Sequence, residues 1–129
     1  MMRKGKWILI GVLFVGILSA FPCTGLAADF KLGAILPMSG GGAFYGEDAK
    51  RAIELAVETL GGKITVGGTT YNLKVVYYDD GAVPSEAVKW LRQLATLHRI
   101  NVIIGPNGAA QSNAVATINE QEKVLAMMN

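Results

Sequence analysis

The most constraining feature of this 129-residue sequence is a regular alternation between short apolar runs and amphipathic segments with helical spacing. Phe30–Leu36 and Val102–Ile104 are mostly apolar runs that end at Pro37 and at Gly105-Pro106, as buried strands do. Between such runs, apolar residues recur at spacings of three and four, which is the period of a helix with one buried face. This alternation predicts an α/β fold, with a parallel sheet and helices on both of its faces.

Three helices are expected in this pattern. The first starts at Glu47 and ends at Gly61-Gly62, the second starts at Pro84, and the third spans Ala109–Gln121. The apolar positions of the first two helices are Ala49, Ile53, Ala56, Val57 and Leu60, and then Val88, Leu91, Leu94 and Ala95.

Two further strands are expected around Gly67-Gly68. Lys63–Val66 and Tyr71–Tyr78 are rich in β-forming residues, and a two-glycine connection between such runs is typical of a hairpin. Val124–Met128 predicts a last strand, and no helix follows it in the sequence. We therefore expect residues 29–129 to form an incomplete N-terminal lobe of a larger protein.

The N-terminus has the layout of a secretory signal peptide. Met1–Trp7 is basic, Ile8–Phe21 is an uncharged, mostly apolar run of 14 residues, and small residues follow at Ala27 and Ala28. The apolar run is shorter than the roughly 20 residues that span a membrane. Residues 1–28 are therefore predicted to be a cleaved signal peptide that directs the chain to the periplasm, with a retained membrane anchor as the alternative.

The single cysteine, Cys23, follows Ala20-Phe21-Pro22, which is not the small and aliphatic context of a lipid-modified cysteine. Cleavage after Ala27 or Ala28 would remove it, so we expect neither a disulfide nor a cysteine metal site in the mature chain.

The charge balance argues against a nucleic-acid partner. Removal of Arg3, Lys4 and Lys6 with the signal peptide leaves nine basic residues against ten acidic ones. No segment of the remaining sequence carries the basic stripe that backbone binding to a nucleic acid requires.

Two glycine-rich loops follow predicted strands, at residues 37–46 and 105–112. In an open parallel sheet, ligands bind in loops at the carboxyl ends of the strands, and the N–H groups of a following helix can hold an anion. The first loop lacks the lysine and hydroxyl residue of a phosphate-binding loop and the spacing of a dinucleotide site. These loops therefore predict a ligand site without a nucleotide cofactor.

Asp79, Asp80 and His98 are the remaining candidates for chemistry. The two aspartates could form a metal pair, but capping of the loop after a strand is favoured because the only histidine lies a helix away. His98 is expected at the surface near a helix end, where it complements the helix dipole. One histidine completes no catalytic set, so we predict no catalytic residue, no metal and no enzyme.

Three motifs in sequence order indicate a family. They are Pro-x-Ser-Gly at residues 37–40 with an aromatic residue and glycine at Tyr45 and Gly46, Asp79-Asp80 at a strand end, and Ile-Gly-Pro at residues 104–106. With the segments around them, which cover Phe30–Asn129, they make the sequence resemble the type I periplasmic solute-binding proteins for branched-chain amino acids. This resemblance implies two α/β lobes that close over a small polar ligand and dock on the permease of an ABC importer.

The resemblance also implies a ligand site. Tyr45 matches the aromatic residue that lines the family's cleft, with packing of the loop onto the helix as the alternative. Asn107, Gly108, Ala109 and Ala110 match the turn whose backbone N–H groups bind the carboxylate of the ligand. Many members have a serine where this chain has Ala109, so the expected ligand is a branched-chain amino acid or a related acid, amide or aromatic compound.

Two other classes of protein share such a fold. A sensory ligand-binding domain of a receptor would normally keep a membrane anchor, and a hydrolase or reductase would need the catalytic set that is missing. For the lobe alone, we expect no amino acid to bind more tightly than millimolar, because the charged groups of the second lobe would be absent.

Overall fold

The computed structural model of the protein describes residues 27–128, in which five strands alternate with helices. Cys23 and all but the last two residues of the expected signal peptide lie outside the described residues. The elements are β1 (Asp29–Leu36), the short 3-10 helix η1 (Gly40–Gly42), α2 (Ala43–Thr59), β2 (Lys63–Val66), β3 (Thr69–Asp79), α3 (Pro84–Thr96), β4 (Val102–Ile104), α4 (Ala109–Ala116) and β5 (Leu125–Met127).

The strands form one mostly parallel sheet in the order β2-β3-β1-β4-β5. β1 pairs in parallel with β3 on one side and with β4 on the other, and β5 pairs in parallel with β4. Only the edge strand β2 is antiparallel, because it is the first arm of the predicted hairpin with β3. Both glycines of its turn, Gly67 and Gly68, have positive φ, at 56° and 82°, as this kind of tight hairpin requires.

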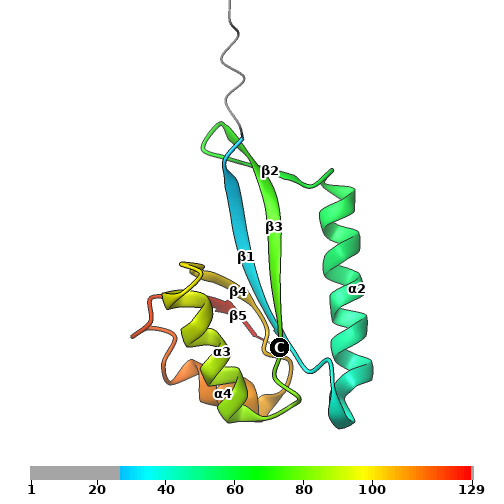
Figure 1. The fold of residues 1–129 in the computed structure, drawn as a ribbon, viewed down its shortest axis with the longest axis vertical. Helices are drawn as coiled ribbons and strands as arrows, with labels where there is room; N and C mark the ends of the chain where they lie inside the picture. The colour runs from blue at the N-terminus through cyan, green and yellow to red at the C-terminus, as the bar shows by residue number, and fades with distance from the viewer. Residues whose placement is uncertain (1–26, 129) are drawn as a thin grey trace, which may run out of the picture.

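The helices lie on both faces of the sheet, as predicted (Figure 1). Val76 and Tyr78 of β3 pack on the side of α3 and α4, whereas Val75 and Tyr77, the residues between them, face α2. The hydrophobic core lies on the α3 and α4 side and includes Ile35, Leu91, Leu94, Ile100, Ile103 and Val115, all at most 1% exposed.

The two faces are covered unequally. Gly33 lets α3 approach β1 closely, since a Cβ there would lie 2.7 Å from Leu94 Cδ1. α2 packs more loosely, and Gly46 is its only buried residue. Within the part of the chain that the structure describes, no helix is long and apolar enough to cross a membrane.

Several predicted boundaries were wrong, including that of β3, which spans Thr69–Asp79 rather than Tyr71–Tyr78. α2 begins at Ala43 rather than Glu47, because the glycines of the loop form the 3-10 helix η1, which continues directly into α2. α4 ends at Ala116 rather than Gln121, and a series of turns follows it to Lys123, whose φ is +55°. The last strand is shorter than expected, Leu125–Met127, since it pairs only with the three residues of β4.

Candidate functional site

The candidate site lies where the chain reverses its direction of travel across the sheet. From β1 the chain passes through α2 to β3, and it then crosses through α3 to β4 on the other side of β1. The connections after β1 and after β4 therefore leave toward opposite faces of the sheet. In open parallel sheets, this point between two neighbouring strands is where a crevice for ligands forms.

Asp79 joins the loop after β1 to the loop after β3. Its Oδ1 accepts hydrogen bonds from the backbone N–H groups of Met38 at 2.8 Å, Ser39 at 3.1 Å and Gly81 at 2.9 Å. Burial alone would raise the pKa of Asp79, but these bonds and one from the Ser39 hydroxyl outweigh it and hold the pKa below its usual value. The ionised carboxylate thus sets the shape of the glycine-rich loop.

Asp80 is in a different environment, although it is the next residue. It is 1% exposed, and its Oδ1 accepts a hydrogen bond from the backbone N–H of Ala82 at 3.0 Å. Among the described residues, Oδ2 of Asp80 has no hydrogen-bond partner. Burial, aided by the charge of Asp79, raises the pKa of this carboxyl despite the bond from Ala82.

These contacts decide between the two interpretations of the aspartate pair. Both carboxylates accept bonds from backbone N–H groups within or across the loops, which is a capping role. No group of three or more His, Cys, Asp or Glu side chains among residues 27–128 is arranged to hold a metal ion. The hydrogen bonds themselves confirm the capping interpretation of Asp79 and Asp80.

Replacement of Asp80 by asparagine should raise the free energy of unfolding at pH 7 by about 1 kcal/mol, because a buried neutral group costs less than a buried charge. The native pKa lies above the unfolded value of about 3.9. Wild type therefore pays no charge penalty below that value, and the penalty grows as pH rises toward the native pKa. Urea unfolding of wild type and Asp80→Asn between pH 3.5 and 7 measures the gain.

The gain should disappear at the acid end of that range. Asp48→Asn, on the exposed surface of α2, is the control and should change the free energy of unfolding at pH 7 by no more than about 0.5 kcal/mol. A loss of stability at pH 7 in Asp80→Asn would contradict the assignment of an unpaired buried charge.

Two glycines bring the loops close to the sheet. A Cβ on Gly46 would overlap the backbone carbonyl of Pro37, so the first turn of α2 can lie directly on the loop after β1. Gly105, at the end of β4, has φ +89°, and a Cβ there would overlap the carbonyl oxygen of Ile35. The Gly105-Pro106 peptide bond is cis. The missing side chain at Gly105 thus lets the end of β4 lie directly against β1.

The structure brings the predicted ligand residues to the two loops that flank this point. Tyr45 lies in the first turn of α2, is 68% exposed, and touches the ring of Phe44 edge-on at a centroid distance of 5.8 Å. A ring so exposed contributes little to packing of the loop onto the helix. Tyr45 is therefore open to contact with a ligand.

The second set of predicted residues forms the entry to α4. Asn107 and Gly108 are half-buried in the loop, and Gly108 is the N-cap of α4. Ala109 and Ala110 are exposed and are the first two residues of the helix. Their backbone N–H groups belong to the first turn of the helix. N–H groups in a first turn have no hydrogen-bond acceptor within the helix itself.

Sequence reasoning did not find the residues that support this entry. Gln111 is buried beneath it, and a Cβ on Gly108 would lie 2.6 Å from its Oε1. Ser112 Oγ donates to the carbonyl of Pro106 at 3.3 Å. Polar residues at the third and fourth positions of a short helix were the available signal, but the direction of their side chains depends on how α4 packs against α3.

His98 has a structural role that differs from the predicted one. Its Nε2 lies 2.8 Å from the hydroxyl of Tyr78, whose ring stacks on Trp90 at a centroid distance of 4.4 Å. The indole of Trp90 donates to the carbonyl of Asp79 at 2.8 Å. His98 is thus half-buried in an aromatic cluster that supports the end of β3, rather than a simple surface residue near a helix end.

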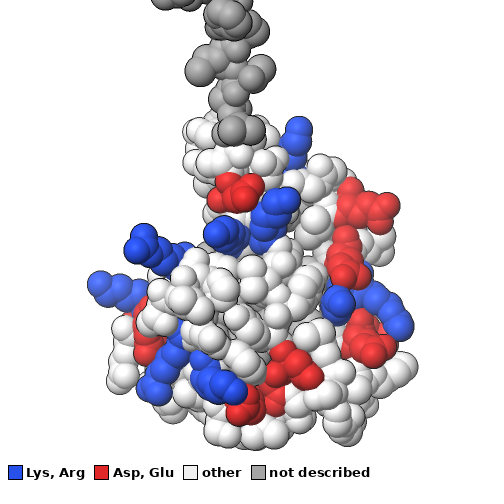
Figure 2. All heavy atoms as spheres, viewed as in Figure 1, with Lys and Arg blue, Asp and Glu red and all other residues white. Residues whose placement is uncertain are grey.

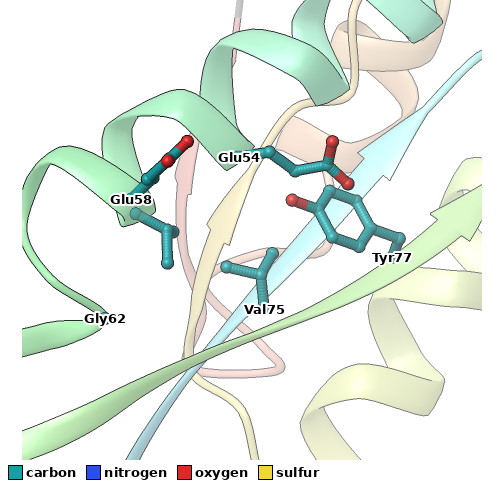
Figure 3. A pocket seen from close by; sticks show the side chains of 6 residues that line it. Glu54, Glu58, Gly62, Val75 and Tyr77 are labelled. Carbon is teal, nitrogen blue, oxygen red and sulfur yellow. The ribbon is translucent and has the colours of Figure 1, made fainter.

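A hollow lies on the α2 side of the sheet, between α2 and β3 (Figure 3). It measures about 330 Å³ and is lined by Val57, Gly62, Val75 and Tyr77, with Glu54 and Glu58 at its rim. Burial and the nearby charge of Glu54 raise the pKa of Tyr77. Two glutamates would repel a carboxylate, so this hollow is a poor site for an acidic ligand.

The comparisons with known proteins agree with one another. Residues 29–128 match the family described as "Periplasmic binding protein". The Leu/Ile/Val-binding protein of Escherichia coli K12 is 30% identical over 122 residues, which are 95% of this chain and 31% of that protein. Leu/Ile/Val-binding protein homolog 8 of Brucella suis is 30% identical over 113 residues, 88% of this chain and 27% of that protein.

Solved structures give the same result. A solute-binding protein of an ABC transporter from Rhodopseudomonas palustris, in complex with 3,4-dihydroxybenzoic acid, has a TM-score of 0.70 and 32% identity over 78% of this chain and 26% of that one. A leucine-binding protein from Thermotoga maritima has a TM-score of 0.67 and 31% identity, over 76% of this chain and 27% of that one. The chain spans less than a third of the length of these relatives.

Proposed function

Because this chain belongs to the periplasmic binding protein family, we propose that it supplies one wall of the ligand site of a solute receptor for an ABC importer. The observation that carries this proposal is the placement of Tyr45 and the entry to α4 on the two loops that flank the reversal point of the sheet. The family is one of binding proteins, so the prediction that the chain is not an enzyme is confirmed.

The proposed site separates the two ends of a ligand. The N–H groups of Gly108, Ala109 and Ala110 at the start of α4, and the positive end of the α4 dipole, suit a carboxylate. The exposed ring of Tyr45 suits the apolar or aromatic body of the same molecule. Ala109 brings no hydroxyl to the carboxylate, so backbone groups carry this part of the binding.

The names of the relatives support a small organic acid as the ligand. Two are named for leucine, isoleucine and valine, and one was solved with 3,4-dihydroxybenzoic acid. All of these molecules combine a carboxylate with an apolar or aromatic body. We propose that this chain binds a member of that class in the periplasm, after removal of residues 1–28, and that a permease receives the ligand.

A titration followed by NMR tests the proposal on this chain, since it detects binding that is weaker than millimolar. Leucine, valine, benzoate and 3,4-dihydroxybenzoate are added separately to the ¹⁵N-labelled chain. Amide signals of residues 38–46 and 107–111 should move together on addition of at least one acid. No movement at tens of millimolar, or movement confined to Val75 and Tyr77 at the hollow under α2, would contradict the proposed site.

Tyr45→Ala should weaken binding of the acid found in this way about tenfold, the effect of losing one aromatic anchor of a site. The temperature of unfolding should stay unchanged, because the side chain is 68% exposed. Leu55→Ala, at a residue 64% exposed on the same helix, is the matched control and should leave the affinity as it is. Equal losses of affinity and stability in Tyr45→Ala would show that its role is packing.

Ala109→Ser should strengthen binding of α-amino acids, because it adds a hydroxyl donor at the entry to α4. One hydrogen bond to a charged group contributes about 1.5–3 kcal/mol, or roughly tenfold or more in affinity. Dissociation constants for leucine and benzoate in wild type and variant measure the effect. If no carboxylate gains affinity, the acid group does not bind at this turn.

A further inference from the structure

The basic side chains of the described residues fall into two groups. Lys50, Arg51, Lys89 and Arg92 each form an ion pair with a glutamate or aspartate, at 2.7–3.8 Å. The other five lysines and arginines of residues 27–128 make no ion pair there, and all five are exposed. These five, named here the basic end, are Lys31, Lys63, Lys74, Arg99 and Lys123.

All five lie toward the end of the sheet where β1, β4 and β5 begin. Lys31 of β1 and Lys74 of β3 are register partners, so two like charges sit directly opposite each other on the sheet. Lys63 lies two residue positions further toward the end of the sheet, since its partner Asn72 also pairs with Asp29. The remaining two residues are in the turns that lead into β4 and β5.

This region also has a shallow cavity of about 440 Å³ on its surface. Its lining includes Lys31, His98, Arg99 and Asn101 beside Phe30. Its one acidic residue is Asp29, whose carboxylate already lies 3.4 Å from the amide of Asn72. In Figure 2, blue and red side chains lie beside one another over the lower part of the molecule, whereas in the upper part several blue side chains lie around a red group.

Five unpaired cations in one place are costly unless an anion approaches them. The register pair Lys31 and Lys74 is unfavourable in the isolated sheet. The basic end presents several positive charges around one apolar residue, Phe30. Such a group of charges is complementary to a surface that presents many negative groups at once. Anionic lipid headgroups form such a surface and attract basic residues within a Debye length.

The position of the N-terminus adds a second argument. Asp29 begins β1 at the basic end, and the apolar run Ile8–Phe21 precedes it in the sequence by only seven residues. Even fully extended, seven residues span at most about 25 Å. If that run stays in the bilayer before cleavage, the start of β1 and the basic end beside it lie within about 25 Å of the headgroups.

We propose that the basic end binds the anionic lipid surface of the membrane. The loops that carry Tyr45 and Ala109 are at the carboxyl ends of the strands, on the opposite side of the fold. A chain adsorbed in this way keeps its candidate ligand loops turned away from the bilayer and open to solutes. This inference does not depend on the identity of the ligand.

Co-sedimentation with lipid vesicles tests the proposal on the full chain, recovered in whatever processed form its export produces. Vesicles of equal parts phosphatidylglycerol and phosphatidylcholine should bind it, and vesicles of phosphatidylcholine alone should bind it far less. Lys31→Gln with Lys74→Gln should lower the partition coefficient by about fivefold per lysine, or roughly 25-fold together. Raising the salt from 0.1 to 0.5 M should abolish the difference between the two kinds of vesicle.

Lys50→Gln with Lys89→Gln is the matched control, because it removes the same net charge from ion-paired sites elsewhere. This variant should bind the anionic vesicles within about twofold of wild type. Equal losses in the two double variants would overturn the proposal in favour of net charge alone. Equal binding of wild type to both kinds of vesicle would overturn it as well.

Discussion

Gly105→Ala should prevent the chain from folding stably. Its φ of +89° is a backbone conformation that an alanine adopts only under strain, at about 1–3 kcal/mol. The new Cβ would also overlap the carbonyl oxygen of Ile35, and a backbone group in a core strand cannot move aside as a flexible side chain can. Together these effects should cost about 3–5 kcal/mol, a large part of the 5–15 kcal/mol typical of a whole domain.

Circular dichroism and urea unfolding of purified Gly105→Ala measure this effect. Gly41→Ala is the control, since a Cβ at Gly41 meets nothing within 4 Å and the residue needs no positive φ. The control should change the free energy of unfolding by no more than about 0.5 kcal/mol. A stable Gly105→Ala protein would mean that the backbone at position 105 does not lie this close to Ile35 of β1.

Asp79→Ala should lower the free energy of unfolding by about 3–4 kcal/mol, the next largest loss after that of Gly105→Ala. Three backbone N–H groups lose a charged hydrogen-bond acceptor at once in this variant. The loop after β1 should lose its defined shape as well, and with it the position of Tyr45. Urea unfolding measures the first effect. Amide exchange at Met38 and Ser39 measures the second, since both N–H groups should exchange faster in the variant.

The advantage of wild type over Asp79→Ala should depend on pH. The native pKa of Asp79 lies below its unfolded value of about 3.9, so the stabilisation is fully present above that value. It should decrease as pH falls through the native pKa and the carboxylate is protonated. Asp48→Ala, at an exposed aspartate on α2, should cost less than about 0.5 kcal/mol at pH 7. A similar loss in both variants would show that Asp79 has no special role.

For Asp79 and Asp80, the sequence predicted the structural role but not the electrostatic environment. Their position after a β-rich run predicted that they cap a loop, and this was confirmed because Asx capping depends on nearby backbone groups. Their opposite pKa shifts could not be predicted. One carboxylate meets N–H groups from 40 residues away, and the other is enclosed by elements that pack over it.

The sequence alone determined the α/β class, the hairpin at Gly67-Gly68 and the two loops that carry the candidate site. These features follow from the spacing of apolar residues and from glycines within a few positions of one another, so they are local. The tertiary structure alone decided the order β2-β3-β1-β4-β5, the contact of His98 with Tyr78, and the gathering of Lys31, Lys74 and Arg99 at one end. Strand order joins residues that are far apart in the chain, and no local pattern specifies which distant residues will meet.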